Sequence, residues 1–314
     1  MQFTRPLGPL LVALLAGCSS GPLTTAAGND AGAKETPTPD AAIAGMDTAA
    51  GDAATTPNVD AGVAMPAPQC IESPQPQPGA RSTVTVSADL LYAGKPVVYG
   101  EPFALPSGGT LTVSDFRFFV SDVTLLRQGA LPVAVDIVAA DGKPVPYNLH
   151  LVNAESAAGM SFRIAAPPGE YTGMSFIFGV NDACNHVDPS SAQTPLTSNS
   201  ELSWPPPFGY LFLRYEGNVM AAGAKDAPPT ALAMGGVAGV VMAPRVSAAG
   251  SLKFAGTGAS SVRLHVAVDE LFKAAAMPTA GEVPELPGGP EMLAGEHVRQ
   301  NVDKVQIFSV TTGP

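Results

Sequence analysis

Hydrophobic and polar residues alternate with a period of two along most of the chain after residue 80. The clearest segments are Thr83–Leu91, Tyr171–Val180 and Ser261–Asp269, which place apolar side chains on one face. Such alternation is the pattern of a half-buried β-strand. Weaker or shorter segments of the same kind are Leu111–Leu126, Leu131–Val138, Ser161–Ala165, Gly209–Gly217, Val237–Met242, Ser251–Phe254 and Val305–Val310. About nine to eleven short strands separated by turn residues predict an all-β fold, specifically an antiparallel β-sandwich with long loops.

The alternation has two kinds of interruption. In the longest segment, residues 116–120 follow one phase and residues 123–125 follow the other. One extra residue in a strand produces such a change, so we expect a β-bulge near Phe119. Near the C-terminus, Glu270–Ala276 and His297–Asp303 have helical spacing and predict short helices.

The longest break in the pattern lies between two strong strands, within Phe178–Gly217. This stretch contains the only Trp of the chain, Trp204, together with His186 and Cys184. Long loops between strands are uncommon unless they have a function, and binding residues often lie on them. We therefore expect the functional residues here.

The N-terminus has the features of an export signal. Residues 1–17 contain Arg5, then the apolar run Leu10–Leu15, then small residues before Cys18. The run is too short to span a bilayer. Its ending, Leu-Ala-Gly-Cys, resembles the bacterial lipoprotein box, which implies cleavage before Cys18 and lipid on its thiol. Ser follows at residues 19 and 20, and the resemblance then favours sorting to the outer membrane, facing the periplasm or the cell surface.

Residues 18–80 are rich in Ala, Gly, Thr, Pro and Asp, and no aromatic residue occurs between Phe3 and Tyr92. Such a segment cannot bury enough apolar surface to offset its ordering entropy. We expect a disordered linker that holds the folded domain, residues 81–314, away from the membrane.

The composition and the motifs disfavour two classes of function, nucleic-acid binding and enzymatic catalysis. Charged residues make up 14% of the chain and the formal net charge is −11. Nucleic-acid binding is disfavoured because phosphates require a basic face. No G-x-S-x-G motif or catalytic triad is apparent, so we expect a binding protein and not an enzyme.

The histidines are candidate metal ligands. Imidazole suits copper, and neighbouring carboxylate or amide groups can orient the ring. Asn185 and Asp188 are such neighbours, whereas His150, between two leucines, is interpreted as structural. No two histidines have a short metal-binding spacing, so the fold must assemble any site, and each candidate is also consistent with a surface side chain. The candidate ligands are His186, His265 and His297.

Two thiols remain besides Cys18. An exported chain meets an oxidising compartment, which favours a disulfide between Cys70 and Cys184. A copper(I)–thiolate site that includes Cys184, or two free thiols, are the alternatives.

Trp204 precedes three consecutive prolines, which fix the backbone and donate no hydrogen bonds. Its side chain is then either a reactive aromatic group at a partner interface or an ordinary core aromatic.

Several motifs together resemble the MbnP-like family, also called metallo-mystery-pair proteins. They occur in the family's order, across roughly residues 83–312. They are SDFRFFVSDV at 114–123, PGEYTGMSFIFGV at 168–180, NHVDPSSAQTPL at 185–196 and WPPPFGYLFLRYEG at 204–217, followed by His297, Asn301 and Phe308.

The resemblance implies a copper-binding protein of the periplasm and a partner, a di-haem c-type protein of the MauG type that oxidises a Trp of the copper protein to kynurenine. Trp204 is the candidate for that modification, and Asn185, Asp188 and Tyr210 would surround the metal. Where many relatives have a second Trp, this chain has Pro206.

Two other functions remain open from the sequence. One is a metal-free structural or adhesion-type surface β-sandwich. The other is a sugar- or peptide-binding module in which Trp204 and Tyr210 form a stacking platform.

Overall fold

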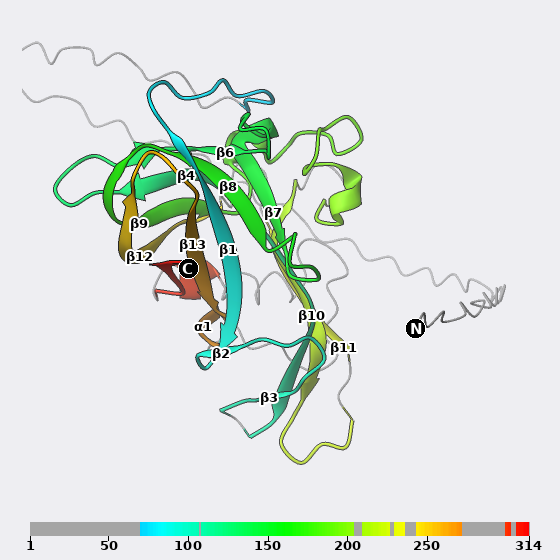
Figure 1. Ribbon diagram of the computed structural model, residues 1–314. Coiled ribbons are helices and arrows are strands. Elements are labelled where there is room, and N and C mark those ends of the chain that lie inside the picture. The colour runs from blue at the N-terminus through cyan, green and yellow to red at the C-terminus, as the bar shows by residue number, and fades with distance from the viewer. Residues whose placement is uncertain are drawn as a thin grey trace, which may run out of the picture. The chain divides into compact units, whose positions relative to one another are not determined.

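The computed structural model describes residues 70–106, 108–203, 209–226, 229–235, 243–271, 299–302 and 306–313. These residues are mostly strands, as the alternating pattern predicts (Figure 1). The longer strands are β1 (Ser82–Tyr92), β4 (Thr110–Leu126), β7 (Leu149–Asn153), β8 (Ser161–Ala166), β9 (Gly169–Phe178), β10 (Leu211–Met220), β11 (Pro229–Gly235), β12 (Arg245–Phe254), β13 (Ser260–Ala267) and β14 (Phe308–Thr312).

Short elements complete the described structure. The short strands are β2 (Lys95–Pro96), β3 (Phe103–Ala104), β5 (Val133–Ala134) and β6 (Asp136–Val138). The helical turns are η1 (Pro146–Asn148), η2 (Asp182–Cys184), η3 (Ser198–Ser200), α1 (Val268–Leu271) and residues 299–302.

These strands form one hydrogen-bonded sheet in the order β11-β10-β4-β9-β12-β14-β13-β1-β8-β6. Two neighbouring pairs, β1–β13 and β12–β14, are parallel, whereas the other pairs are antiparallel. The predicted all-β class is confirmed. The sheet is mixed, which corrects the predicted purely antiparallel pairing, and the sandwich arrangement stays a prediction. Alternation is typical of antiparallel sheets, but here the alternating strands β1 and β13 are parallel.

Strand β4 organises the sheet because it has partners on both edges. Residues 110–118 pair with β10 and residues 120–126 pair with β9. On the opposite edge, residues 117–121 pair with β7 and residues 124–125 pair with β5. Val135 links β5 directly to β6, the last strand of the sheet order, so the sheet curves back towards β4.

The phase change in β4 arises from bulges, but not at Phe119. The pairing with β9 shifts register between Ser121 and Thr124, where Asp122 has a positive φ of 48°. The pairing with β10 shifts opposite Glu216 and Gly217, around Ser114. The predicted bulge therefore lies at Asp122 and not at Phe119. A second bulge, around Ser114, precedes it in the strand.

Most of the sequence-predicted strands agree with the structure within a few residues. The segment predicted at 131–138 is divided into β5 and β6, and the closing strand begins at Phe308 instead of Val305. Strand β7 was not predicted. The predicted strand at 237–242 lies outside the described residues, as do most of the two predicted C-terminal helices, of which α1 and residues 299–302 are seen.

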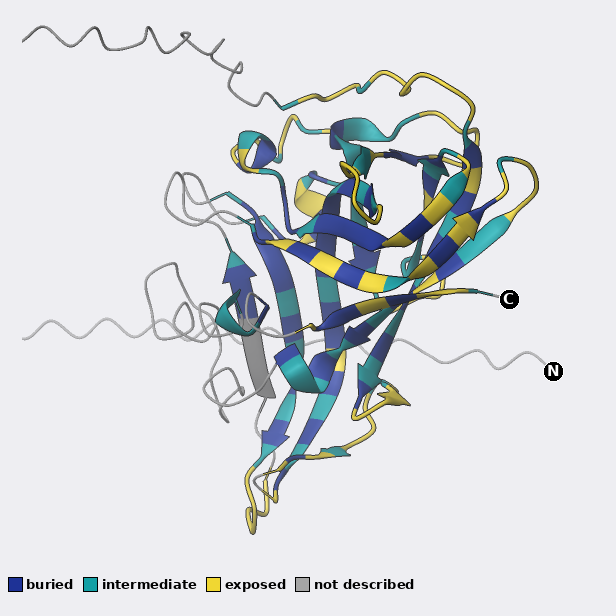
Figure 2. Cartoon of the chain, turned by 90° about the vertical axis from the view of Figure 1, so that its left-hand side faces the viewer, coloured by how far each residue is buried: buried dark blue, intermediate teal, exposed yellow. Residues whose placement is uncertain are grey.

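The core contains a cluster of phenylalanines from the neighbouring strands β4 and β9 and from β14, which is not a sheet neighbour of either. Phe178 on β9 lies 5.2 Å, between ring centroids, from both Phe118 on β4 and Phe308 on β14. Strand β12 separates β9 from β14 in the sheet order, so the curvature brings these rings together. Figure 2 shows buried residues alternating with intermediate or exposed ones along the strands, and mostly exposed residues at the tips of the loops.

We predict that Phe178→Ala lowers the free energy of unfolding by about 3–5 kcal/mol, because it removes a buried ring from the centre of this cluster. Urea denaturation measures the effect. The matched control is Leu131→Ala, since Leu131 is 86% exposed. Equal destabilisation by the two substitutions would contradict the assigned core.

Candidate functional site

The described residues between β9 and β10, 179–203 and 209–210, form a long connection that we call the central loop. It leaves the sheet beyond the pair Phe178–Val120 and returns just before the pair Leu213–Phe118. Both ends are therefore fixed on neighbouring residues of β4. Backbone pairing with β4 holds only these ends, so side-chain contacts and packing determine the conformation between them.

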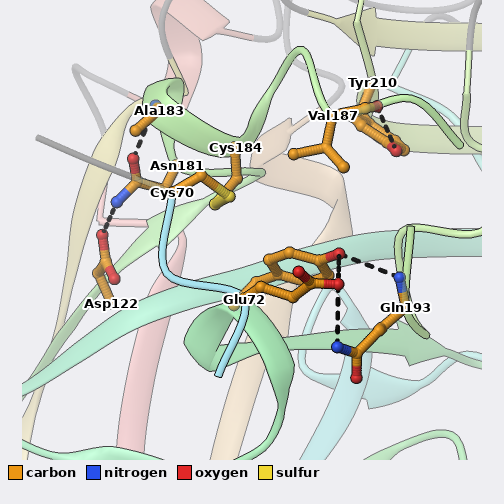
Figure 3. The surroundings of a disulfide bond; sticks show 10 residues. Cys70, Glu72, Asp122, Asn181, Ala183, Cys184, Val187, Gln193 and Tyr210 are labelled. Atoms are coloured by element: carbon orange, nitrogen blue, oxygen red, sulfur yellow. Dashed lines mark hydrogen bonds between the residues drawn. A yellow bond between two sulfur atoms is a disulfide. The ribbon is translucent and has the colours of Figure 1, made fainter. Parts of the chain in front are cut away.

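A disulfide is one such contact. Cys70 and Cys184 are bonded, as predicted, and join the start of the described chain to the central loop (Figure 3). Because both sulfur atoms belong to this bond, neither is a thiolate, and the alternative of a copper(I)–thiolate site at Cys184 is not supported.

Next to the disulfide, a polar cluster joins the same two segments. The side-chain amide of Gln193 donates to Glu72 Oε1 at 2.9 Å. The backbone N–H of Gln193 donates to the hydroxyl of Tyr147 at 3.0 Å, and this hydroxyl lies 3.5 Å from the Glu72 carboxylate. The N-terminal segment is thus attached to the central loop by hydrogen bonds as well as by sulfur.

Asn181 fixes the beginning of the central loop. Its side-chain oxygen accepts from the backbone N–H of Ala183 at 2.9 Å and caps the turn η2. Its side-chain nitrogen donates to Asp122, the residue at the β4 bulge (Figure 3). Burial raises the pKa of Asp122, while this hydrogen bond and Arg245 act in the opposite direction. The bulge thus has a role, because it directs a carboxylate towards the loop.

Asn185 and Tyr210, both predicted to surround the metal, fasten the two halves of the loop together. Asn185 Oδ1 accepts from the backbone N–H of Tyr210 at 2.9 Å. The Tyr210 hydroxyl lies 2.7 Å from the carbonyl oxygen of Leu196 and 2.9 Å from that of Val187. Burial is the main cause of the raised pKa of Tyr210, so its hydroxyl remains a neutral donor. Gly209 leaves the space for Asn185, since a Cβ there would lie 2.5 Å from the Asn185 carbonyl oxygen.

His186 is exposed on this framework, beside the buried Asn185. Asp188 is also exposed, and its Oδ1 accepts from the backbone N–H of Ser190 at 2.9 Å, which lowers the pKa of the carboxyl group. Asp188 therefore closes a turn of the loop, while the imidazole of His186 faces solvent.

Three predicted site residues, Trp204, His297 and Cys18, lie outside the described residues. The described neighbours of Trp204 are well fixed: Ser203 pairs with Tyr210, and Leu211 N–H donates to the Leu202 carbonyl oxygen at 2.7 Å.

A charged network next to this pairing was not predicted. Asp115 is buried and contacts Arg117 at 2.9 Å and Arg214 at 3.3 Å. Both arginines also contact the central-loop carboxylate of Glu201, at 3.0 and 3.5 Å, respectively. Burial raises the pKa of Asp115, and the two guanidinium groups oppose that shift. One signal in the sequence could have predicted this network. Asp115 and Arg117 are two residues apart, as are Arg214 and Glu216, and this spacing puts both members of each pair on the same face of their strand.

His265, the third predicted ligand, lies on the face of β13 opposite to the valines, as expected from the alternation. It pairs in register with Asp89 on β1 and with Ser309 on β14. Its Nδ1 lies 3.5 Å from Asp89 Oδ2, and its Nε2 lies 3.1 Å from Thr311 Oγ1. Asp89 was not predicted as a site residue, because its partner is remote in the sequence.

Within the described residues, no three His, Cys, Asp or Glu side chains converge as a metal-binding group. In the same ranges, no helix is long and apolar enough to cross a membrane.

The sequence profile of the MbnP family matches residues 81–286, which is well over half of the chain. The chain belongs to the MbnP family. The matched range contains most of the described strands and the whole central loop. The MbnP resemblance inferred from the sequence motifs is thereby confirmed.

The chain is also similar to the solved structure of MbnP from Methylosinus trichosporium. The two are 17% identical, the match covers 74% of this chain and 99% of that chain, and the TM-score is 0.49. No curated protein sequence matches the chain.

We predict that the double substitution Cys70→Ser and Cys184→Ser lowers the free energy of unfolding by about 2–5 kcal/mol, because it opens a long covalent loop in the unfolded chain. The two cysteines are 114 residues apart in sequence. Urea denaturation provides the measurement. Glu72→Gln is the control, since it keeps the disulfide and changes only the polar cluster beside it; a loss as large as that of the double variant would contradict this account.

A second prediction concerns pH. His150 is half-buried against Phe162, and burial lowers its pKa from 6.5 to about 4. Below pH 6.5 the unfolded chain therefore takes up a proton that the folded chain does not. Stability from this residue is present above pH 6.5 and falls by up to about 3 kcal/mol as the pH decreases towards 4.

His150→Phe keeps a ring next to Phe162 but does not titrate. The difference in unfolding free energy between the parent and this variant should change across that pH range. A difference that stays constant from pH 7 to pH 4 would contradict the assigned pKa.

Proposed function

We propose that this chain is a copper-binding protein and not an enzyme, exported and anchored to the bacterial outer membrane through lipid on Cys18, with its folded part facing the periplasm. Its partner is a di-haem c-type protein of the MauG type, which oxidises Trp204 to kynurenine. The observation that carries the proposal is the family match over residues 81–286.

The chemistry of the described residues is compatible with copper. Imidazole nitrogen suits copper, and the His186 imidazole is exposed on a loop that is covalently fixed. Nδ1 of His265 is buried without a hydrogen-bond partner in the described residues. The proposal assigns copper to His186, His265 and His297. When bound, copper would supply a redox-active centre.

In this proposal, the role of Asn185, Asp188 and Tyr210 is to hold the central loop in one conformation, in addition to surrounding the metal. Their hydrogen bonds hold the central loop closed, through Asn185 to Tyr210, Tyr210 to Leu196, and Asp188 to Ser190. A closed loop presents His186 and the chain next to Trp204 in a fixed arrangement. Such pre-organisation reduces the ordering cost of binding a metal or a partner.

The arginine network supports the assignment of a partner surface near Trp204. Glu201 lies three residues before Trp204 in the sequence, and its carboxylate contacts both Arg117 and Arg214. The Arg214 guanidinium also donates to the Glu201 carbonyl oxygen at 3.2 Å. Electron transfer and covalent modification by a partner both require a defined docking geometry.

Mass spectrometry of protein purified from its native host tests this function. We expect the peptide that contains Trp204 to have the mass of its kynurenine form, and we expect copper in the same sample. The Trp204→Phe variant is the control, since its peptide cannot acquire that modification. Unmodified Trp204 with bound copper would remove the haem partner from the proposal. Absence of both would favour a metal-free surface protein.

A further inference from the structure

The segment that leads from the disulfide to strand β1, residues 70–80, forms no strand or helix of its own. We call it the strap. Residues 71–73 and 75–80 are exposed, and only Cys70 and Pro74 are half-buried. The strap therefore buries little apolar surface, and burial contributes little to holding it in place.

Polar contacts fasten the strap to the folded body at Glu72 and at Gln77. The side-chain amide of Gln193 donates to Glu72 Oε1 at 2.9 Å, in an exposed position. The backbone N–H of Gln77 donates to Asp136 Oδ2 at 2.8 Å and is partly buried. Hydrogen bonds of this kind add little net stability because water replaces them, whereas ordering the backbone costs free energy at every residue. Such contacts alone are too weak to keep the strap ordered.

The disulfide is therefore the main fastening of the strap (Figure 3). It bonds Cys70 to the buried Cys184 of η2, within the central loop. At its other end the strap runs into Ser82, which begins β1 and pairs with Ala166 on β8. Without the sulfur bond, the strap would be held firmly at that end alone.

We propose that the Cys70–Cys184 disulfide is a redox switch, and that its reduction releases the strap while the sheet stays folded. The hydrogen bond between Asn185 and Tyr210 does not involve the strap, so it persists in the reduced chain. The part of the central loop near Gln193 loses its contact with the strap. This inference goes beyond the proposed function and requires neither copper nor a haem partner.

The reductant in this switch is a dithiol. One of its thiols, as the thiolate, attacks the sulfur of Cys70, the more exposed of the two cysteines, and the sulfur of Cys184 leaves as a thiolate that takes up a proton. The second thiol then attacks the mixed disulfide and releases Cys70, which is protonated in turn. Two electrons and two protons pass to the protein, and the dithiol becomes a disulfide.

Release of the strap also lengthens the chain that precedes the folded body. The first fixed residue is Cys70 in the oxidised chain and Ser82 in the reduced chain. The strap adds up to about 36–40 Å at full extension. This effect on reach rests on the proposed lipid anchor at Cys18, whereas the release itself does not.

The test is nuclear magnetic resonance relaxation of the full chain, before and after reduction with dithiothreitol. Alkylation and peptide mass spectrometry check that both Cys70 and Cys184 are reduced. The backbone order parameters of the strap should fall from about 0.85, the value of a rigid backbone, to below about 0.6. Those of β1 and of Tyr210 should stay unchanged.

Two variants accompany this measurement. Cys70→Ser should give the low order parameters of the strap without any reductant. Glu72→Gln keeps the disulfide and should leave the strap ordered until dithiothreitol is added. If Cys70→Ser fails to fold, the reduced parent chain supplies the same comparison.

Three results would overturn the switch. The first is a strap whose order parameters are the same in the oxidised and the fully reduced chain. The second is loss of the dispersed signals of the sheet on reduction, which would make the disulfide a requirement of the whole fold. The third is a disulfide that dithiothreitol reduces only after the chain has been unfolded. None of these results bears on copper binding, so the proposed function is tested separately.

Discussion

Backbone pairing along β4 is the interaction on which the rest of this structure depends. The strand has 17 residues and exchanges one partner, β10, for another, β9, along the same edge. This exchange fixes where the central loop leaves and re-enters the sheet. A register slip of one residue would turn every side chain of β4 to the other face, which would bury Arg117 and expose Phe118. The loop geometry and the charged network are therefore consequences of one register.

Polar contacts act together with apolar burial to determine the shape of the central loop, where Val180, Leu196 and Leu202 are buried in the core. Tyr210 and Asn185 are buried, but the groups they bind are backbone N–H and carbonyl groups of the loop. Buried backbone groups need such partners, since leaving them unsatisfied is costly. A loop fixed in this way keeps polar and exposed residues in defined places. His186 can thus be both accessible and well positioned.

Sequence reasoning succeeded where one physical signal dominates. Strands β1 and β13 have one buried and one partly exposed face, so their alternation gave their positions within a few residues. Strand β7 was missed because the Leu-His-Leu pattern around His150 mixes buried and half-buried residues on both faces. The parallel pairing of β1 with β13 leaves no mark in either strand alone. Asp89 was missed for that reason, since its contact Arg263 is 174 residues away.

The disulfide also determines how the molecule carries mechanical load. Cys70 is bonded to Cys184, so a pull on the chain before Cys70 reaches the central loop through sulfur as well as through the residues that lead into β1. Because the disulfide carries part of the force to the central loop, less force acts on the hydrogen bonds that hold β1 in the sheet. A protein tethered at its N-terminus would thus transmit tension to its own site loop before its core is strained.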